Sequence, residues 1–194
     1  MQKRAFVDCG AFVGDALWKF RSGTTGDVVM HAFEPNRHLD AKYPVGTIVH
    51  NEAVWIEDGE IDLYFSKRGK CRSVTSVMKN KTSGHLNKKK PEKVPCVDFS
   101  KWLLNHFDAD DEITLKMDIE GAEYKVLRKM IDDGSIGLVN RVYVEFHVHK
   151  MDMDFEKHRA LVKEVMALDS LQLFGDYLPS LYHPERANIE WYLK

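Results

Sequence analysis

A short stretch near the N-terminus constrains the fold more than any other part of the sequence. Residues 4–15 read RAFVDCGAFVGD, an apolar run followed by an acid and two glycines, Gly10 and Gly14, ahead of a helical pattern. This order is typical of the first strand, turn and helix of a nucleotide-binding α/β domain. Gly10 would let the backbone turn sharply beside a ligand, and Gly14 would let the helix pack closely on the strand. The G-x-x-x-G spacing predicts no pyrophosphate cradle, and by itself it also fits a simple tight turn.

Strand-like and helix-like segments alternate along the rest of the chain. Further strands are expected over 28–33, 47–50, 112–117 and 138–146, and helices over 14–21, 36–42, 100–107, 122–131 and 155–168. A hairpin is expected from 54–56 and 61–65 because Asp58-Gly59 is a strong turn dipeptide. Residues 171–174 and 189–193 could pair antiparallel. The alternation predicts a single α/β domain over residues 1–194, with a mostly parallel sheet and right-handed crossovers.

The bulk properties restrict the class of protein. A chain of 194 residues with 44% hydrophobic and 30% charged residues is ordinary for one globular domain. Its apolar runs fall short of the roughly 18 residues that a membrane helix needs, and the N-terminus lacks the pattern of a signal peptide. Three widely spaced cysteines, Cys9, Cys71 and Cys96, favour reduced thiols over disulfides or a zinc site. We therefore expect a cytoplasmic protein without a membrane partner.

The charge is distributed unevenly. Residues 66–93 hold ten Lys and Arg residues against one acid, Glu92, in a chain whose net charge is −2. Such a basic insertion could steer an anionic partner, cover a substrate site, or form a solvated flexible loop. It contains no aromatic residue on which bases could stack, so a nucleic-acid partner is compatible with the sequence but not favoured.

Polar side chains follow several expected strands at the point where each one ends. These residues are Asp8, Glu34, Asn51, Asp118 and Glu145. Because the carboxyl ends of parallel strands meet at one edge of a sheet, and ligands bind there, we expect these residues to lie along one rim. Burying so many acids and amides is costly unless they have a partner, which favours a ligand site over a set of structural turns.

Three positions on this rim suggest roles. Glu34 lies about 20 residues beyond the glycine turn and could accept hydrogen bonds from a ribose diol, unless it is simply an exposed loop acid. Residues 51–53 could recognise an adenine edge or form a plain turn. Asp118 could hold a substrate hydroxyl or an ammonium group. Glu120 and Glu123 could instead favour the N-terminus of the following helix, and we interpret Glu123 in that way.

His147 and His149 are two residues apart and would share a face of a strand. The two histidines, with Asp118 or Glu145 nearby, could bind a metal. No further histidine has supporting spacing, so the sequence predicts no metal site. A general base is the favoured role, and His147 is the better candidate because it lies closer to the strand end. A purely structural His147 remains an alternative.

Six short motifs occur in a fixed order along the chain. They are D-C-G-A-F-V-G at 8–14, F-E-P-N at 33–36, N-E-A-V at 51–54, V-D-F at 97–99, K-M-D-I-E-G-A-E at 116–123 and E-F-H at 145–147. Together they resemble the FkbM-type methyltransferases, class I enzymes that use S-adenosylmethionine and mostly O-methylate hydroxyls of sugars, polyketides and related metabolites. The likeness covers about residues 4–150. Phe12 stands where the family often has Asn, so a polar contact near the cofactor is in question.

The resemblance implies a Rossmann-like class I methyltransferase fold, with a mostly parallel seven-stranded sheet flanked by helices and an antiparallel C-terminal strand. It implies that S-adenosylmethionine is the cofactor, and a cofactor without phosphates agrees with the G-x-x-x-G turn. By position, Asp8, Gly10 and Gly14 would shape the methionine end of the cofactor site, Glu34 would hold the ribose, and Asn51, Glu52 and Ala53 would lie near adenine. Ala11, Pro35 and Asp118 complete the implied set of cofactor-binding residues. Asp118, Glu120 and His147 would face the methyl acceptor as catalytic residues.

The predicted function is therefore O-methylation of a hydroxyl on a sugar, glycan or other small metabolite. One alternative is a methyltransferase or non-catalytic binding module that uses residues 66–93 to dock nucleic acid or an acidic glycan. Another is a nucleotide-dependent oxidoreductase, which a G-x-G-x-x-G turn would favour and this sequence lacks.

Overall fold

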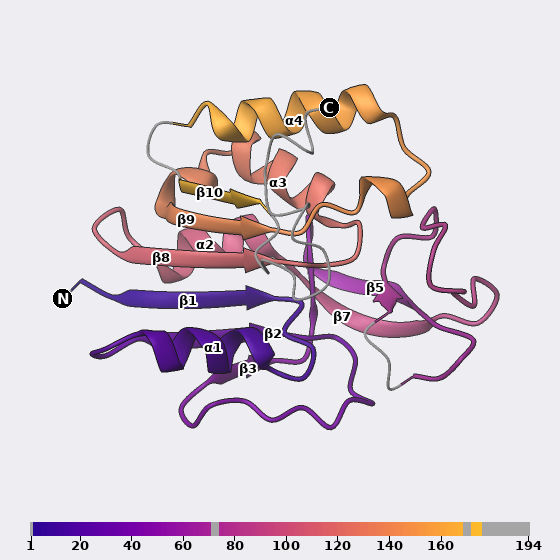
Figure 1. Cartoon of the computed structure of the whole chain (residues 1–194), viewed down its shortest axis with the longest axis horizontal. Helices are drawn as coiled ribbons and strands as arrows, with labels where there is room; N and C mark the ends of the chain where they lie inside the picture. The colour runs from indigo at the N-terminus through magenta and orange to yellow at the C-terminus, as the bar shows by residue number, and fades with distance from the viewer. Residues whose placement is uncertain (1, 71–73, 169–171, 176–194) are drawn as a thin grey trace.

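The computed structural model describes residues 2–70, 74–168 and 172–175 and contains two sheets (Figure 1). The larger sheet has the order β10-β9-β8-β1-β2-β3, and all its pairings are parallel. Its strands are β1 (Arg4–Cys9), β2 (Val29–Phe33), β3 (Ile48–His50), β8 (Glu112–Met117), β9 (Val139–Val144) and β10 (Gln172–Gly175). The strand order reverses beside β1, which is where α/β sheets open a ligand crevice.

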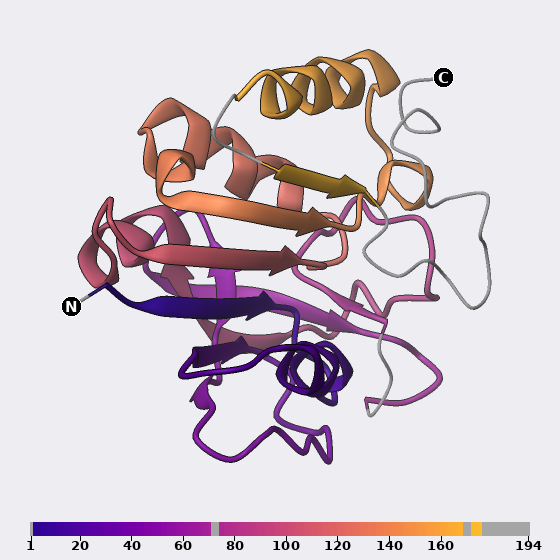
Figure 2. The same ribbon diagram turned by 60° about the vertical axis from the view of Figure 1, so that its left-hand side comes forward.

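Helices cover both faces of this sheet (Figure 2). They are α1 (Asp15–Gly23), α2 (Phe99–His106), α3 (Glu123–Asp132) and α4 (Phe155–Met166). Successive side chains of β1 point to opposite faces. Phe6 packs with Leu17 of α1, whereas Val7 and Cys9 belong to the core cluster that contains buried residues of α2, α3 and α4. A strand buried on both faces explains the continuous apolar run that the sequence shows.

A second sheet lies beyond the carboxyl ends of the first (Figure 1). Its strands are β4 (Ala53–Trp55), β5 (Gly59–Phe65), β6 (Thr75–Ser76) and β7 (Glu92–Asp98), in the order β4-β7-β5-β6. The expected hairpin of 54–56 with 61–65 is therefore wrong, because β7 lies between the two strands, parallel to β4 and antiparallel to β5. Val94 and Cys96 of β7 are buried in the cluster that joins this sheet, so packing outweighs the local turn signal.

The expected helix over 36–42 and the expected C-terminal strands also have to be compared with the structure. No helix forms over 36–42; instead, the Asn36 side chain accepts a hydrogen bond from the His38 amide (3.1 Å) and donates one to Lys70 O (2.8 Å). An Asn that bonds two residues ahead stabilises a turn in place of a helix. The described part of the larger sheet has six strands, and β10 is parallel to β9. The expected strand at 189–193 lies outside the described residues. No described helix is long and apolar enough to cross a membrane.

Part of the basic segment packs onto the carboxyl edge of the larger sheet. The Thr82 amide donates a hydrogen bond to Lys150 O at 2.8 Å. The backbone of Lys81 pairs with that of Met151 in an isolated antiparallel β-bridge. The Lys81 side chain is fully buried. Residues 74–86 therefore cover part of the carboxyl edge of the larger sheet.

His31 of β2 and His50 of β3 stack on each other, and both rings contact Trp102 of α2. His31 Nδ1 lies 3.1 Å from His50 Nε2, and the His31 ring meets Trp102 edge-on. Burial, with repulsion from His50 and His106, lowers the pKa of His31 to about 4. The unfolded chain therefore binds this proton more tightly than the folded protein does. The contribution of neutral His31 is fully present above about pH 6.5 and is lost as the pH falls towards 4.

We therefore expect the free energy of unfolding to depend less on pH when His31 is replaced by Gln. Between pH 7 and pH 5 the original protein should lose about 1–2 kcal/mol more than His31→Gln, because only the original protein must exclude a proton at this position. Urea unfolding of both proteins at the two pH values measures the difference. Equal losses in the two proteins would contradict the assignment.

Candidate functional site

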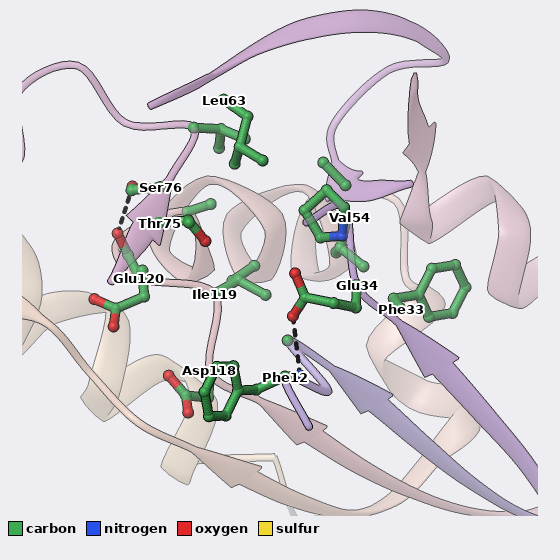
Figure 3. A pocket seen from close by; sticks show the side chains of 15 residues that line it. Phe12, Phe33, Glu34, Val54, Leu63, Thr75, Ser76, Asp118, Ile119 and Glu120 are labelled. Atoms are coloured by element: carbon green, nitrogen blue, oxygen red, sulfur yellow. Dashed lines mark hydrogen bonds between the residues drawn. The ribbon is translucent and has the colours of Figure 1, made fainter. Parts of the chain in front are cut away.

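A cavity of about 120 Å³ opens at the carboxyl edge of the parallel sheet (Figure 3). Its floor is formed by the segments that follow β1, β2 and β8, and its other walls come from β4, β5 and residues 75–77. The apolar part of the lining includes Phe33, Val54 and Leu63, and its carboxylates belong to Glu34, Asp118 and Glu120. A partly apolar cavity with a few convergent polar groups is the usual form of a small-molecule site.

Gly10 brings the turn after β1 against the turn after β8. Its amide and that of Ala11 both donate to Phe33 O at 3.0 Å. Gly10 has a φ of +84°, and a Cβ placed on it would lie 1.9 Å from Asp118 O. Both the backbone conformation and the close approach therefore require glycine here.

Glu34 projects into the cavity from the end of β2 (Figure 3). Its Oε2 accepts a hydrogen bond from the Phe12 amide (2.9 Å) and its Oε1 accepts one from the Asn36 amide (2.8 Å). Burial raises the pKa of Glu34, although these backbone hydrogen bonds and Lys116 favour its charged form. Phe12 has a φ of +46°, an unfavourable conformation for a bulky residue. This strained turn is what presents the Phe12 amide to Glu34.

A buried ion pair supports the floor of the cavity. Lys116 Nζ lies 2.9 Å from Asp8 Oδ1 and 3.6 Å from Asp118 Oδ2, and it donates to Gly10 O at 2.7 Å. Asp8 is fully buried beneath the turn, and burial raises its pKa against the attraction of Lys116. Burial also raises the pKa of Asp118 to about 6. Lys116 thus ties β1 and β8 together below the two turns.

His147 is buried behind the carboxylates at the edge of the cavity. Its Nδ1 and its backbone amide lie 3.1 and 3.0 Å from Glu123 Oε1. Its Nε2 lies 3.4 Å from both Glu120 Oε2 and Glu145 Oε1, and 3.6 Å from Asp118 Oδ1. Burial lowers the pKa of His147, but Glu123 and the other carboxylates outweigh it and hold this pKa well above its usual value. The adjacent His147 in turn lowers the pKa of Glu145 to about 2.

Glu120 joins this cluster to the wall of the cavity. Its φ is +55°, its main-chain oxygen accepts a hydrogen bond from Ser76 Oγ (2.7 Å; Figure 3), and its carboxylate forms an ion pair with Lys81. Among described residues, three that are not glycine have a positive φ, and two of them, Phe12 and Glu120, line the cavity. Backbone strain of this kind concentrates at functional sites.

The structure brings together only part of the residues that the sequence singles out. Those that line the cavity are Gly10, Glu34, Pro35, Ala53, Asp118 and Glu120. Asp8 and His147 are buried next to it, and Ala11 and Gly14 pack within the fold. Asn51 is exposed, and Glu52 lies 3.5 Å from His50. None of these last six residues lines this cavity.

Several residues at the site have roles that the sequence does not predict. Glu123 is the first residue of α3, as expected for a first-turn acid, but it is also fully buried and orients His147, and it accepts a hydrogen bond from the Gly121 amide (2.8 Å). Lys116 could have been noticed, because a lysine within an otherwise apolar strand needs a buried acid as its partner. Nothing in the sequence indicates that Lys81, one of ten basic residues in 66–93, would reach Glu120.

A scan against family models decides the family. The model described as "Methyltransferase FkbM domain" matches residues 8–168, which include every residue of the cavity. The chain belongs to the FkbM methyltransferase family. No match was found among curated proteins or among solved structures. The FkbM assignment confirms the resemblance carried by the six sequence motifs, and it agrees with the α/β fold and its mostly parallel sheet.

Proposed function

We propose that this FkbM family member transfers a methyl group from S-adenosylmethionine to a hydroxyl of a sugar, a glycan or another small metabolite. The observation that carries the proposal is the position of Glu34. Its carboxylate is held by two backbone amides at a strand end and projects into a cavity that Asp118 also lines. A strand-end acid in this position suits a ribose diol, and a second acid suits a hydroxyl acceptor.

The residues present fit S-adenosylmethionine. A carboxylate has about four lone-pair sites, so Glu34 retains acceptor capacity for ribose hydroxyls beyond its two backbone partners. The glycine turn at Gly10 offers close backbone approach, and no cradle for phosphates is needed. The cavity lining carries three carboxylates, which favour a cationic sulfonium over a neutral ligand. Val54 and Leu63 supply the apolar surface that an adenine ring requires.

Methyl transfer depends chiefly on the relative positions of the reacting atoms. In methyl transfer, the hydroxyl oxygen bonds to the methyl carbon while the carbon–sulfur bond breaks and its electron pair goes to sulfur. Holding the reacting atoms about 3 Å apart in line supplies much of the acceleration. The hydroxyl proton must also leave, and we assign its removal to Asp118, because the Asp118 carboxylate lines the cavity. His147 does not line it, so we assign it a positioning role through Asp118 and Glu120.

Glu34→Ala should weaken S-adenosylmethionine binding at least tenfold, about 1.4 kcal/mol, because it removes the proposed ribose acceptor. Glu34→Gln keeps the shape of the side chain and should weaken binding less. Isothermal calorimetry measures both, and Glu60→Gln, at an exposed position of β5, is the control. Absence of binding by the unaltered protein would overturn the proposal, and equal affinity of Glu34→Ala would remove Glu34 from the cofactor site.

A further inference from the structure

We propose that Asp118, Glu120 and His147 form a binding site for a divalent cation of the Mn²⁺ type at the edge of the cavity. Each residue offers one ligand atom, and these atoms all lie within 4.8 Å of one another. The Nε2 atom of His147 is 3.4 Å from Glu120 Oε2 and 3.6 Å from Asp118 Oδ1. Two ligands that share a metal at about 2.1 Å are separated by roughly 3–4 Å, so these distances suit a common cation.

The imidazole of His147 is oriented as that of a metal ligand. Its Nδ1 is 3.1 Å from Glu123 Oε1, and both side chains are almost completely buried. A carboxylate on one ring nitrogen fixes the ring and directs the other nitrogen, as it does in many metal sites. Within the described part of the chain, His147 Nε2 is buried and makes no hydrogen bond. A buried nitrogen that faces carboxylate oxygens, with no hydrogen bond of its own, is a position where a cation can bind between them.

The net charge around His147 Nε2 also favours a bound cation. The connected carboxylates are those of Asp8, Asp118, Glu120, Glu123 and Glu145, and the ammonium groups paired with them are those of Lys81, Lys116 and Lys150. A cation bound to His147 Nε2 would replace the proton on that nitrogen and leave the ring neutral. The five carboxylates would then exceed the three ammonium groups of these described residues by two negative charges. One divalent cation would balance them.

The backbone conformation of Glu120 is strained. Glu120 has a φ of +55° and is followed by Gly121, with a φ of +108°. This φ favours glycine at the second position of the turn, where a Cβ would also lie 2.4 Å from Met151 Sδ. The turn directs the Glu120 carboxylate to the same side as His147 Nε2. Lys81 pairs with the same oxygen of Glu120, so a bound cation would share or replace that contact.

The set of donors selects the kind of cation. One imidazole nitrogen with two carboxylate oxygens suits Mn²⁺ or Zn²⁺ better than Ca²⁺, which prefers oxygen alone. The purpose of the cation rests on the proposed function. A hydroxyl oxygen bound to it would have a lowered pKa. The hydroxyl proton would pass to the carboxylate oxygen of Asp118 that does not bind the cation. At the same time the oxygen–methyl bond forms and the methyl–sulfur bond breaks, with its electron pair going to sulfur.

Titration with Mn²⁺ alone tests the site. The full chain is stripped with a chelator, and unbound Mn²⁺ is followed by electron paramagnetic resonance. The unaltered protein should bind one Mn²⁺, which Zn²⁺ displaces. Asp118→Asn and Glu120→Gln should each weaken binding at least tenfold, whereas Glu60→Gln should not change it. Circular dichroism confirms that each variant is folded.

Calorimetry with S-adenosylmethionine on the same proteins separates this inference from the proposed function. Absence of stoichiometric Mn²⁺ binding, or equal binding by Asp118→Asn and Glu120→Gln, would overturn the cation site even if S-adenosylmethionine binds. Mn²⁺ binding that both variants lose, without S-adenosylmethionine binding, would support the cation site and overturn the proposed function.

Discussion

Replacing Asp118 by Asn is expected to lower methyl-transfer turnover by about 100- to 10 000-fold, the range typical for loss of a positioned acid–base group. S-Adenosylmethionine affinity should change by less than about threefold, because Glu34 holds the proposed ribose contact. Asn keeps the size of the side chain but neither accepts a proton nor supplies a charged ligand. The variant therefore removes both roles proposed for Asp118 without emptying space in the floor of the cavity.

The measurement is the release of S-adenosylhomocysteine with any glycoside or hydroxylated metabolite that the unaltered protein methylates. Glu60→Gln serves as the control, because this exposed side chain of β5 lies outside the cavity lining. Turnover by Asp118→Asn within a factor of about three of the original would exclude Asp118 as proton acceptor. A parallel loss of turnover and cofactor affinity would instead place Asp118 in the cofactor site.

Gly10→Ala is expected to reduce the free energy of unfolding by about 3–5 kcal/mol. The new methyl group would lie 1.9 Å from Asp118 O, and the backbone would keep a φ of +84°. Neither the turn after β1 nor the turn after β8 can move away easily, because Lys116 binds Gly10 O and Asp8 beneath them. S-Adenosylmethionine binding should be lost even where the variant still folds.

Two other glycines serve as controls that separate the steric overlap at Gly10 from the strain of its positive φ. Gly26 also has a φ of +84°, but the nearest atom to a Cβ there is Arg4 Nη1 at 3.8 Å, so Gly26→Ala should cost only about 1–2 kcal/mol. Gly137 has open space around it, and Gly137→Ala should change stability by less than about 0.5 kcal/mol. Urea unfolding measures all three. Similar losses for Gly10→Ala and Gly26→Ala would show that the close approach to Asp118 is not the cause.

Local patterns located much of the candidate site. The rule that ligands meet the carboxyl ends of parallel strands predicts one rim for Glu34, Ala53 and Asp118, and all three line the cavity. The rule needs only the order of the elements, and the periodicity of apolar residues predicts that order well. It fails for Asn51 and Glu52, which also follow a strand but do not line the cavity. Ala53 does line it, as the first residue of β4 in the second sheet.

Strand pairing in the second sheet was not predictable in the same way. Asp58-Gly59 is a strong hairpin signal, yet β7, which begins more than 30 residues later, pairs with both flanking strands. A turn propensity contributes a small local free energy, whereas burying Val94 and Cys96 against both neighbours removes a large apolar area from water. The long-range pairing therefore wins, and no short window of sequence reports it.

The sequence by itself determined the class of fold, the glycine turn, the family and the acids at the strand ends, since these follow from local composition and spacing. Only the tertiary structure decided what each charge does. Folding buries Asp8 against Lys116, places His147 between Glu123 and three further carboxylates, and brings Lys81 to Glu120. The physical reason is that the energy of a charge depends on its burial and on its partners within a few ångströms. Those partners come from segments far apart in the chain.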